Sequence, residues 1–283
     1  MKLIDTHCHI DREGYDNVEE VLKETKEELE LAINIGCCVQ SSLDSKILAE
    51  SNDFIYFSAG VHPNYSSDFS EKDVDALRDM LKSNKAVAVG EIGLDYYRDI
   101  VPADKQKVAF RRQLVLAKET KKPVVIHGRE AYEDIVNILN EDEFKDITVI
   151  MHSYAGSYSQ IESLLDRAFI SFSGILTFPK AIAKETALKV PMSKILVETD
   201  APFLAPQPVR GRKNFPKNVK YVAEELARIK GISFEDVVKR ANNNVLGLAS
   251  YVYTNNLERA HRVSELMETG TVAVNTPVVA LPE

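Results

Sequence analysis

The sequence lacks the features of an exported or membrane-spanning protein. It has only three cysteines in 283 residues, and because an odd number cannot all pair within the chain, we expect a reduced, cytoplasmic setting. No apolar run approaches the roughly 18 residues of a membrane span. The first residues, MKLIDTHCHID, carry charged and histidine side chains where a signal peptide needs an apolar segment. We therefore expect neither export nor a membrane partner.

Motifs of nucleotide-cofactor enzymes and a basic overall charge are missing as well. The chain contains neither GxGxxG after a strand nor GxxxxGK[ST], so we expect no nucleotide cofactor. The net charge of -8 argues against broad electrostatic adhesion to DNA or anionic membranes. It does not exclude a phosphate-bearing substrate, because two bound divalent cations would place about four positive charges in one cleft.

What the sequence does contain is a regular alternation of two kinds of segment. Short apolar runs rich in valine and isoleucine alternate with longer segments whose apolar residues are three and four apart. This alternation indicates repeated βα units around a parallel sheet. The expected strands are residues 2–5, 36–41, 54–60, 86–91, 123–127, 147–152, 169–173 and 195–199, and the expected helices between them are 18–35, 71–83, 104–120, 132–140 and 160–166. The pattern predicts an α/β fold, a single (β/α)8 TIM-like barrel.

The C-terminal third departs from this alternation. Residues 201–218 hold four prolines and a basic cluster, which predicts a long irregular loop. Helices are expected to resume at 216–230 and 233–247. We expect the barrel to occupy residues 1–248 and residues 249–283 to form a C-terminal extension whose structure and role the sequence does not indicate.

Six side chains that are able to bind a metal lie at or just after the ends of the expected strands. These are His7 and His9 after the first strand, Glu91 at the fourth, His127 at the fifth, His152 at the sixth and Asp200 at the eighth. In an α/β barrel the C-terminal ends of the strands converge on one mouth. The sequence therefore predicts a metal site at that mouth, although each residue taken singly has a structural alternative as a hydrogen-bonded histidine or a salt-bridged acid.

The first strand shows why the pattern suits a metal. His7 and His9 are two residues apart, so in extended backbone both rings point to one side and one ion can take both nitrogens. Metal-bound histidines usually donate their second N–H to a carboxylate or a carbonyl. We expect Asp5 to be such an acceptor.

Two acids are the predicted catalytic residues. Glu91 ends an apolar strand, where an isolated carboxylate would be costly to bury, and two cations sharing its oxygens would stabilise it. Asp200 can bind an ion and also take a proton from the attacking water, which makes it the candidate general base. Glu198, two residues earlier on the same strand, is expected to support the ligands from behind.

Four further residues are candidates for substrate binding. His62 follows the third expected strand, and Arg129, Arg210 and Arg212 lie beyond the ends of later strands. The planar guanidinium group suits phosphate oxygens. A structural loop role for His62 and a solvated surface role for each arginine remain the alternatives.

Together these motifs resemble one family. The segments DTHCH (5–9), GVHP (60–63), GEIGLDY (90–96), HS (152–153) and ETDAP (198–202) are similar to those of the TatD deoxyribonucleases, which belong to the amidohydrolase-like barrels. The resemblance covers about residues 1–248. It implies a two-metal phosphodiesterase that acts on DNA from the 3′ end, with His7, His9 and Asp200 on one ion, His127 and His152 on the other, and Glu91 bridging them.

Several alternatives stay open at this point. The same barrel and ligands can polarise a carbonyl, so an amidohydrolase acting on a C–N or carboxylic ester bond is the second candidate. A third is an idle barrel that binds a partner through residues 201–218 or the extension. Oxygen and imidazole ligands admit Mg, Mn and Zn alike, so the sequence predicts two divalent ions without identifying the metal.

Overall fold

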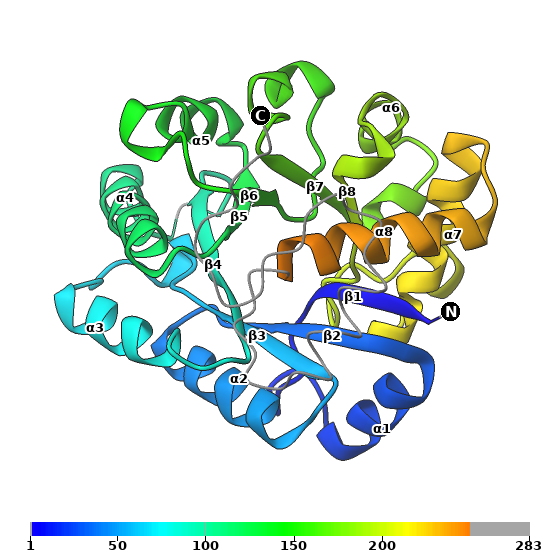
Figure 1. Ribbon diagram of the computed structural model, residues 1–283, viewed down its shortest axis with the longest axis horizontal. Coiled ribbons are helices and arrows are strands. Elements are labelled where there is room, and N and C mark those ends of the chain that lie inside the picture. Colours follow the sequence, from blue (N-terminus) through cyan, green and yellow to red (C-terminus); the bar gives the residue numbers. More distant parts are fainter. Residues whose placement is uncertain (1, 99, 250–283) are drawn as a thin grey trace, which may run out of the picture.

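Eight parallel strands, hydrogen-bonded to one another in chain order, form the centre of the molecule in a computed structural model that describes residues 2–98 and 100–249 (Figure 1). The strands are β1 (Leu3–Cys8), β2 (Leu29–Ile35), β3 (Ile55–Ala59), β4 (Ala86–Asp95), β5 (Val124–Arg129), β6 (Val149–Met151), β7 (Ala168–Phe172) and β8 (Ile195–Val197). The sheet nearly closes where residues after β8 meet β1. There Cys8 and Ala201 form a parallel bridge, and the amide of Asp200 donates to the carbonyl of His7 at 2.9 Å. The predicted (β/α)8 barrel is thus confirmed.

Helices surround this barrel on the outside, and the last helix crosses one end of it (Figure 1). They are α1 (Val18–Glu28), α2 (Val39–Ser51), α3 (Glu71–Met80), α4 (Ala103–Thr120), α5 (Tyr132–Leu139), α6 (Ala183–Lys189), α7 (Val219–Lys230) and α8 (Phe234–Ala249). The last of them, α8, lies against β1 and β8. Most of the connections between strands therefore contain a helix, as parallel neighbours require.

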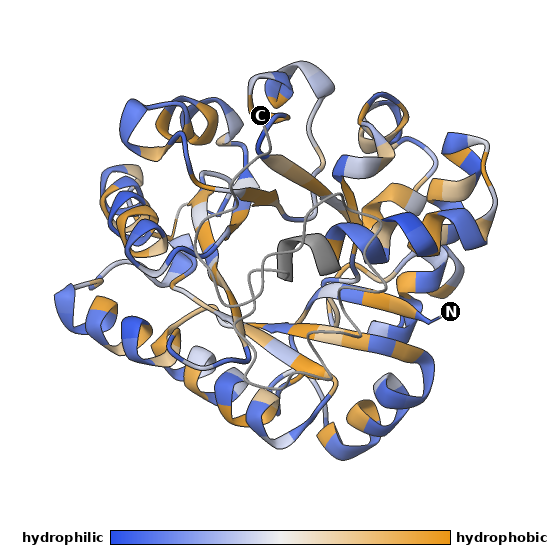
Figure 2. Ribbon diagram, in the orientation of Figure 1, coloured by the Kyte–Doolittle hydropathy of each residue, from blue (hydrophilic) through white to orange (hydrophobic). Residues whose placement is uncertain are grey.

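The hydrophobic core consists largely of strand residues, because the strands are apolar on both faces. Figure 2 shows hydrophobic residues concentrated along the strands. Phe57 on β3, Leu94 on β4 and Phe172 on β7 are almost completely buried. Near-continuous Val, Ile and Leu runs are expected when one face of a parallel strand packs inside the barrel and the other packs against helices. This packing holds the strand ends, and the side chains they carry, in defined positions.

The second strand and the helix after it were predicted wrongly. The apolar spacing of residues 18–35 suggested one helix, but α1 ends at Glu28 and Leu29 enters β2 directly in extended conformation. No glycine or proline marks that change of structure. The expected strand 36–41 is instead a turn and the start of α2, which Cys38 caps by accepting a hydrogen bond from the Ser41 amide. Because cysteine is not among the favoured N-cap residues, the sequence carried little signal for this helix.

Other boundaries differ less. Residues 160–166 form short 3-10 turns (Tyr158–Gln160 and Glu162–Leu164) rather than a helix, and α6 was not predicted. The helix that precedes β5 ends as predicted, with Lys121 in the left-handed conformation and the strand beginning at Val124.

The long loop and the C-terminal extension complete the chain. Residues 201–218 contain only 3-10 turns (Gln207–Val209 and Pro216–Asn218), in agreement with the predicted irregular loop. Residues 250–283 lie outside the described residues, so the boundary at 248/249 stays a prediction. Within the described part, no helix is long and apolar enough to cross a membrane.

Candidate metal centre

The structure brings the six predicted metal-binding side chains together at one end of the barrel. His7 lies on β1 and His9 just after it, Glu91 on β4 and His127 on β5, while the last two follow β6 and β8. Residues up to 193 positions apart in the chain, from His7 to Asp200, are thereby in contact. The convergence of parallel strand ends accounts for this assembly.

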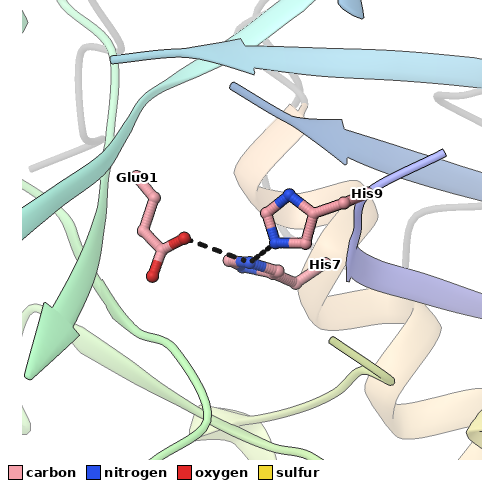
Figure 3. A group of neighbouring side chains, drawn as sticks. All are labelled: His7, His9 and Glu91. Atoms are coloured by element: carbon pink, nitrogen blue, oxygen red, sulfur yellow. Dashed lines mark hydrogen bonds and ion pairs between the residues drawn. The ribbon is translucent and has the colours of Figure 1, made fainter. Parts of the chain in front are cut away.

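Glu91 occupies the centre of the cluster, and its two oxygens face different partners. Oε2 lies 3.6 Å from the Nε2 of His7 (Figure 3). Oε1 lies 2.8 Å from the Nδ1 of His127 and 3.6 Å from the Nε2 of His152. The carboxylate is 4% exposed, so it depends on these neighbours for stabilisation. Its carboxylate therefore lies between two sets of imidazole nitrogens.

The first set consists of two imidazoles and one carboxylate. The Nε2 atoms of His7 and His9 lie 3.2 Å apart (Figure 3), and Oδ1 of Asp200 lies 3.6 Å and 3.3 Å from them. Ligand atoms that surround one ion at about 2.0–2.2 Å stand roughly 3–3.5 Å from each other. Nδ1 of His9 is 3.1 Å from the carbonyl of Ile35, an arrangement in which Nδ1–H donates and Nε2 keeps a free lone pair. This set therefore fits a divalent ion.

The second set is held from behind by two further acids. His152 has its Nδ1 2.7 Å from Oε1 of Glu198, and His127 has its Nε2 3.0 Å from Oδ2 of Asp95. Both contacts are on the side of the ring away from Glu91. Such outer carboxylates fix ring orientation and make a histidine a better ligand. The sequence led us to expect this of Glu198, whereas the role of Asp95 was not predicted.

The charges inside the cluster influence one another strongly. Burial would raise the pKa of Glu91, but His152, His127 and His62 outweigh it and hold that pKa well below the ordinary value. Burial likewise opposes charge on His152, but Glu198 and Glu91 raise its pKa to about 9. Without metal, the cluster is thus a network of ionised carboxylates and histidines that share charge.

His62 joins the cluster in one defined tautomer. Its Nδ1 accepts a hydrogen bond from the Asn64 amide at 3.1 Å, so a neutral ring carries its proton on Nε2. That atom lies 3.8 Å from Oε1 of Glu91. Burial and the neighbouring His127 lower the pKa of His62 to about 3. His62 therefore offers an N–H donor to the site.

Asp5, which we expected to accept a hydrogen bond from the ring of His7, has a different role. Asp5 does not accept a hydrogen bond from the ring of His7; it accepts from the backbone amides of His7 and Thr199 and from the Thr199 hydroxyl. The carboxylate is completely buried, and it ties the start of the barrel to the segment that carries Asp200. The prediction about Asp5 was wrong because residues i and i+2 of a strand bring its carboxylate to the His7 backbone rather than to the ring.

Sequence reasoning also missed Cys37. Its sulfur lies 3.8 Å from Oε2 of Glu91 and 3.8 Å from Nδ1 of His9. Burial raises the pKa of the Cys37 thiol. The residue escaped notice because the sequence placed it inside a strand, whereas β2 ends at Ile35 and puts it at the barrel mouth.

The three arginines are placed at the rim and not inside the cluster. Arg129, at the end of β5, is exposed and its guanidinium lies 3.7 Å over the ring of Tyr97. Arg210 and Arg212 are exposed in the loop after β8, and Arg210 lies 5.0 Å over the ring of Phe178. Within the described part of the chain, none of the three forms a hydrogen bond or ion pair with the six clustered side chains.

Comparison with known sequences gives one match over most of the chain. A family described as TatD related DNase matches residues 4–250. A second match, to the aldehyde dehydrogenase family, covers residues 226–283, a short segment that overlaps α8 and lies mostly outside the described residues.

Individual relatives cover most of the barrel. The Bacillus subtilis protein YabD, named an uncharacterized metal-dependent hydrolase, is 39% identical over 246 residues, which are 86% of this chain and 96% of that protein. The 3'-5' ssDNA/RNA exonuclease TatD of Erwinia tasmaniensis is 33% identical over 186 residues, 63% of this chain and 72% of its own. Among solved structures, the TatD homologue YJJV of Escherichia coli superposes with a TM-score of 0.80 at 26% identity, covering 87% of this chain and 97% of that one.

Proposed function

The chain belongs to the TatD related DNase family, and from that premise we propose that it is a metal-dependent nuclease that hydrolyses phosphodiester bonds in nucleic acid at the centre built around Glu91. The observation that supports this most directly is the placement of the two Glu91 oxygens, one toward His7 and the other toward His127 and His152. A carboxylate between two ligand sets can bridge the two ions of a two-ion hydrolase.

We propose that this centre holds two divalent ions. His7, His9 and Asp200 would bind one ion, His127 and His152 the other, and Glu91 both. When bound, such ions lower the pKa of a water molecule and polarise phosphate oxygens. The mixture of imidazole and carboxylate ligands suits Zn, Mn or Mg, and availability decides among them.

The remaining chemistry belongs to the side chains of the protein. Asp200 directs Oδ1 at the histidines, and no described residue donates a hydrogen bond to its Oδ2, which leaves that oxygen to accept the proton of the attacking water. The Nε2–H of His62 is positioned to donate to an oxygen of the phosphate. Arg129, Arg210 and Arg212 would bind neighbouring phosphates at the rim.

The amidohydrolase alternative has less support. Many related amidases use a modified lysine as the bridging group, but β4 (AVAVGEIGLD) contains no lysine and supplies Glu91 instead.

A catalytically idle barrel is also disfavoured, because such a protein has no reason to assemble all six candidate ligands. Since these ligands all precede Ala201, we further propose that the barrel, residues 1–248, is sufficient for the centre and that residues 249–283 are a C-terminal extension.

The test is release of nucleotides from a 3′-labelled single-stranded DNA, and from the matching RNA, with and without added Mg or Mn. We expect metal-dependent release by the wild type and its loss in Glu91→Ala. The exposed Glu27 on α1 provides a matched control, and Glu27→Ala should keep full activity. A wild type that binds metal but leaves both polymers intact would contradict the nuclease proposal and favour a small ester or amide substrate.

A further inference from the structure

Three exposed aromatic side chains lie in segments that follow strand ends. Among the described residues, Tyr65 is 62% exposed, Tyr97 57% and Phe203 60%. Tyr65 follows β3, Tyr97 follows β4 and Phe203 follows β8. The other large exposed hydrophobic side chains are aliphatic, and most lie on the outer helices: Leu43, Ile47, Ile100, Val108, Ile182 and Leu188. Among the residues that the structure describes, the exposed aromatic side chains are therefore confined to segments at the mouth of the barrel.

Two of these aromatics, Phe203 and Tyr65, extend a continuous row of histidine rings. Along that row, the ring centroids of His9 and His7 are 5.0 Å apart, those of His7 and His152 3.6 Å, and those of His152 and His127 6.3 Å. The ring of His62 follows at 4.3 Å from His127. The row crosses the whole candidate metal centre.

An exposed aromatic ring stands at each end of the row. Phe203 lies 5.9 Å from His9, and Tyr65 lies 6.3 Å from His62. The position of Phe203 is well defined, since its amide donates to the Asp200 carbonyl at 2.8 Å and its own carbonyl accepts from the Asn214 side chain at 2.7 Å. These bonds fix the backbone of Phe203 next to Asp200, while its ring lies beside His9.

The ring of Tyr97 is the third exposed aromatic surface, on the side of His127. Its amide donates to Oδ1 of Asp95, the residue that also contacts His127. The guanidinium of Arg129 covers the ring at 3.7 Å. Within the described residues no carboxylate pairs with Arg129, so its charge remains available to a phosphate while its plane stacks on the ring.

We propose that Phe203 and Tyr97 are stacking surfaces for unpaired bases on the two sides of the scissile phosphodiester. This inference rests on the proposed nuclease function. Bases stack on aromatic side chains with little dependence on sequence, whereas a duplex keeps the faces of its bases inside its own stack. The local charge fits the same substrate, because Arg129 adjoins Tyr97, and Arg210, Arg212 and Lys213 share the loop of Phe203.

The decisive experiment compares two substrates and two variants. The metal-loaded enzyme hydrolyses a single-stranded oligodeoxynucleotide or a matched one whose two 3′-terminal nucleotides are abasic. Phe203→Leu and Tyr97→Leu keep apolar bulk but remove the ring. We expect each variant to lose roughly 5- to 150-fold in kcat/KM on the normal oligonucleotide, the range for one stacked base, and to lose almost nothing further on the abasic one.

Controls separate this effect from damage to the metal centre. Leu188→Ala removes an equally exposed apolar side chain, 58% exposed, from the outer helix α6, and should match the wild type on both substrates. Bound metal per chain should be the same in every variant.

The possible results are distinct. Losses of equal size on both oligonucleotides, or no loss on either, would overturn the stacking role while leaving the nuclease function intact. Equal kcat/KM of the wild type on blunt duplex and on single strands would overturn it as well, and would favour a protein partner for the aromatic surface. A wild type that binds metal but hydrolyses no oligonucleotide would show instead that the proposed function itself is wrong.

Discussion

Oε1 of Glu198 lies 2.7 Å from Nδ1 of His152, on the side of the ring that faces away from Glu91. The same carboxylate accepts hydrogen bonds from the Ser153 amide and the Ser171 hydroxyl. Glu198 is 1% exposed, so its orientation cannot vary freely. This contact directs Nε2 of His152 toward Glu91, whose Oε1 lies 3.6 Å away.

The first prediction concerns that contact. Glu198→Gln replaces one carboxyl oxygen by an amide nitrogen, so His152 becomes a weaker and less well oriented ligand. Loss of such an outer partner typically lowers metal affinity by about 10- to 100-fold. Calorimetric titration of the metal-free protein with Mn2+ should show the loss at one of two binding steps. Two unchanged steps would contradict the role given to Glu198.

A second prediction tests Asp95 and His127 in the same way. Asp95→Asn can keep the Oδ1 acceptor that holds the amides of Tyr97 and Arg98, while it removes the Oδ2 acceptor of His127. We therefore expect metal affinity to fall by about 10- to 100-fold with little change in thermal stability. A large fall in melting temperature without a change in affinity would mean that Asp95 serves only the turn.

A third prediction concerns metal removal. Because the cluster gathers four histidines and two acids with little exposure, ions that bind the folded state should stabilise it. At a free metal concentration 100 times Kd, one ion contributes about 2.7 kcal/mol, which corresponds to a rise of several degrees in Tm. Differential scanning calorimetry with chelator and with Mn2+ measures this shift. Glu91→Ala should abolish it, and a wild type whose Tm is the same in both conditions would argue against tight metal binding.

A fourth prediction concerns the backbone beside His127. Gly93 has a φ of +139°, and an added Cβ would lie 2.1 Å from the carbonyl oxygen of His127. Gly93→Ala should therefore displace β5 and cost more than about 3 kcal/mol, in the upper range for single substitutions, with loss of activity.

Gly231 offers the matched control for this change. It also has a positive φ, +64°, but nothing lies within 4 Å of an added Cβ. Gly231→Ala should cost only the conformational strain, about 1–2 kcal/mol, and leave activity unchanged. Urea denaturation of the two variants gives both values. Equal destabilisation would show that the approach of Gly93 to His127 is unimportant.

The sequence by itself determined the class of fold and the kinds of side chain at the site. Apolar runs alternating with helical periodicity predicted eight strands and a barrel, and seven of the eight expected strand ranges overlap the observed ones. Residues such as Glu91 and His127 could be predicted as metal ligands because a titratable side chain at the end of an apolar parallel strand lies at the mouth of the barrel.

The prediction of helices and strands from local sequence failed where no typical boundary residue marks the change of structure. The change from α1 to β2 occurs at Leu29 without glycine or proline, and Cys38 is an unusual helix cap. The apolar periodicity therefore predicted one helix through the residues of β2. It also placed Cys37 inside a predicted strand and not at the site that it contacts in the structure.

Only the tertiary structure decided which atoms of the site meet. That Glu91 faces His7 with one oxygen and His127 with the other, and that Asp95 supports His127 while Asp5 ties down Thr199, depends on ring orientations and on the stagger between distant strands. Sequence spacing specifies side-chain direction only within one strand. The relation between strands is set by the packing of the whole barrel, because each strand end is positioned by its two neighbours and by the helices behind it.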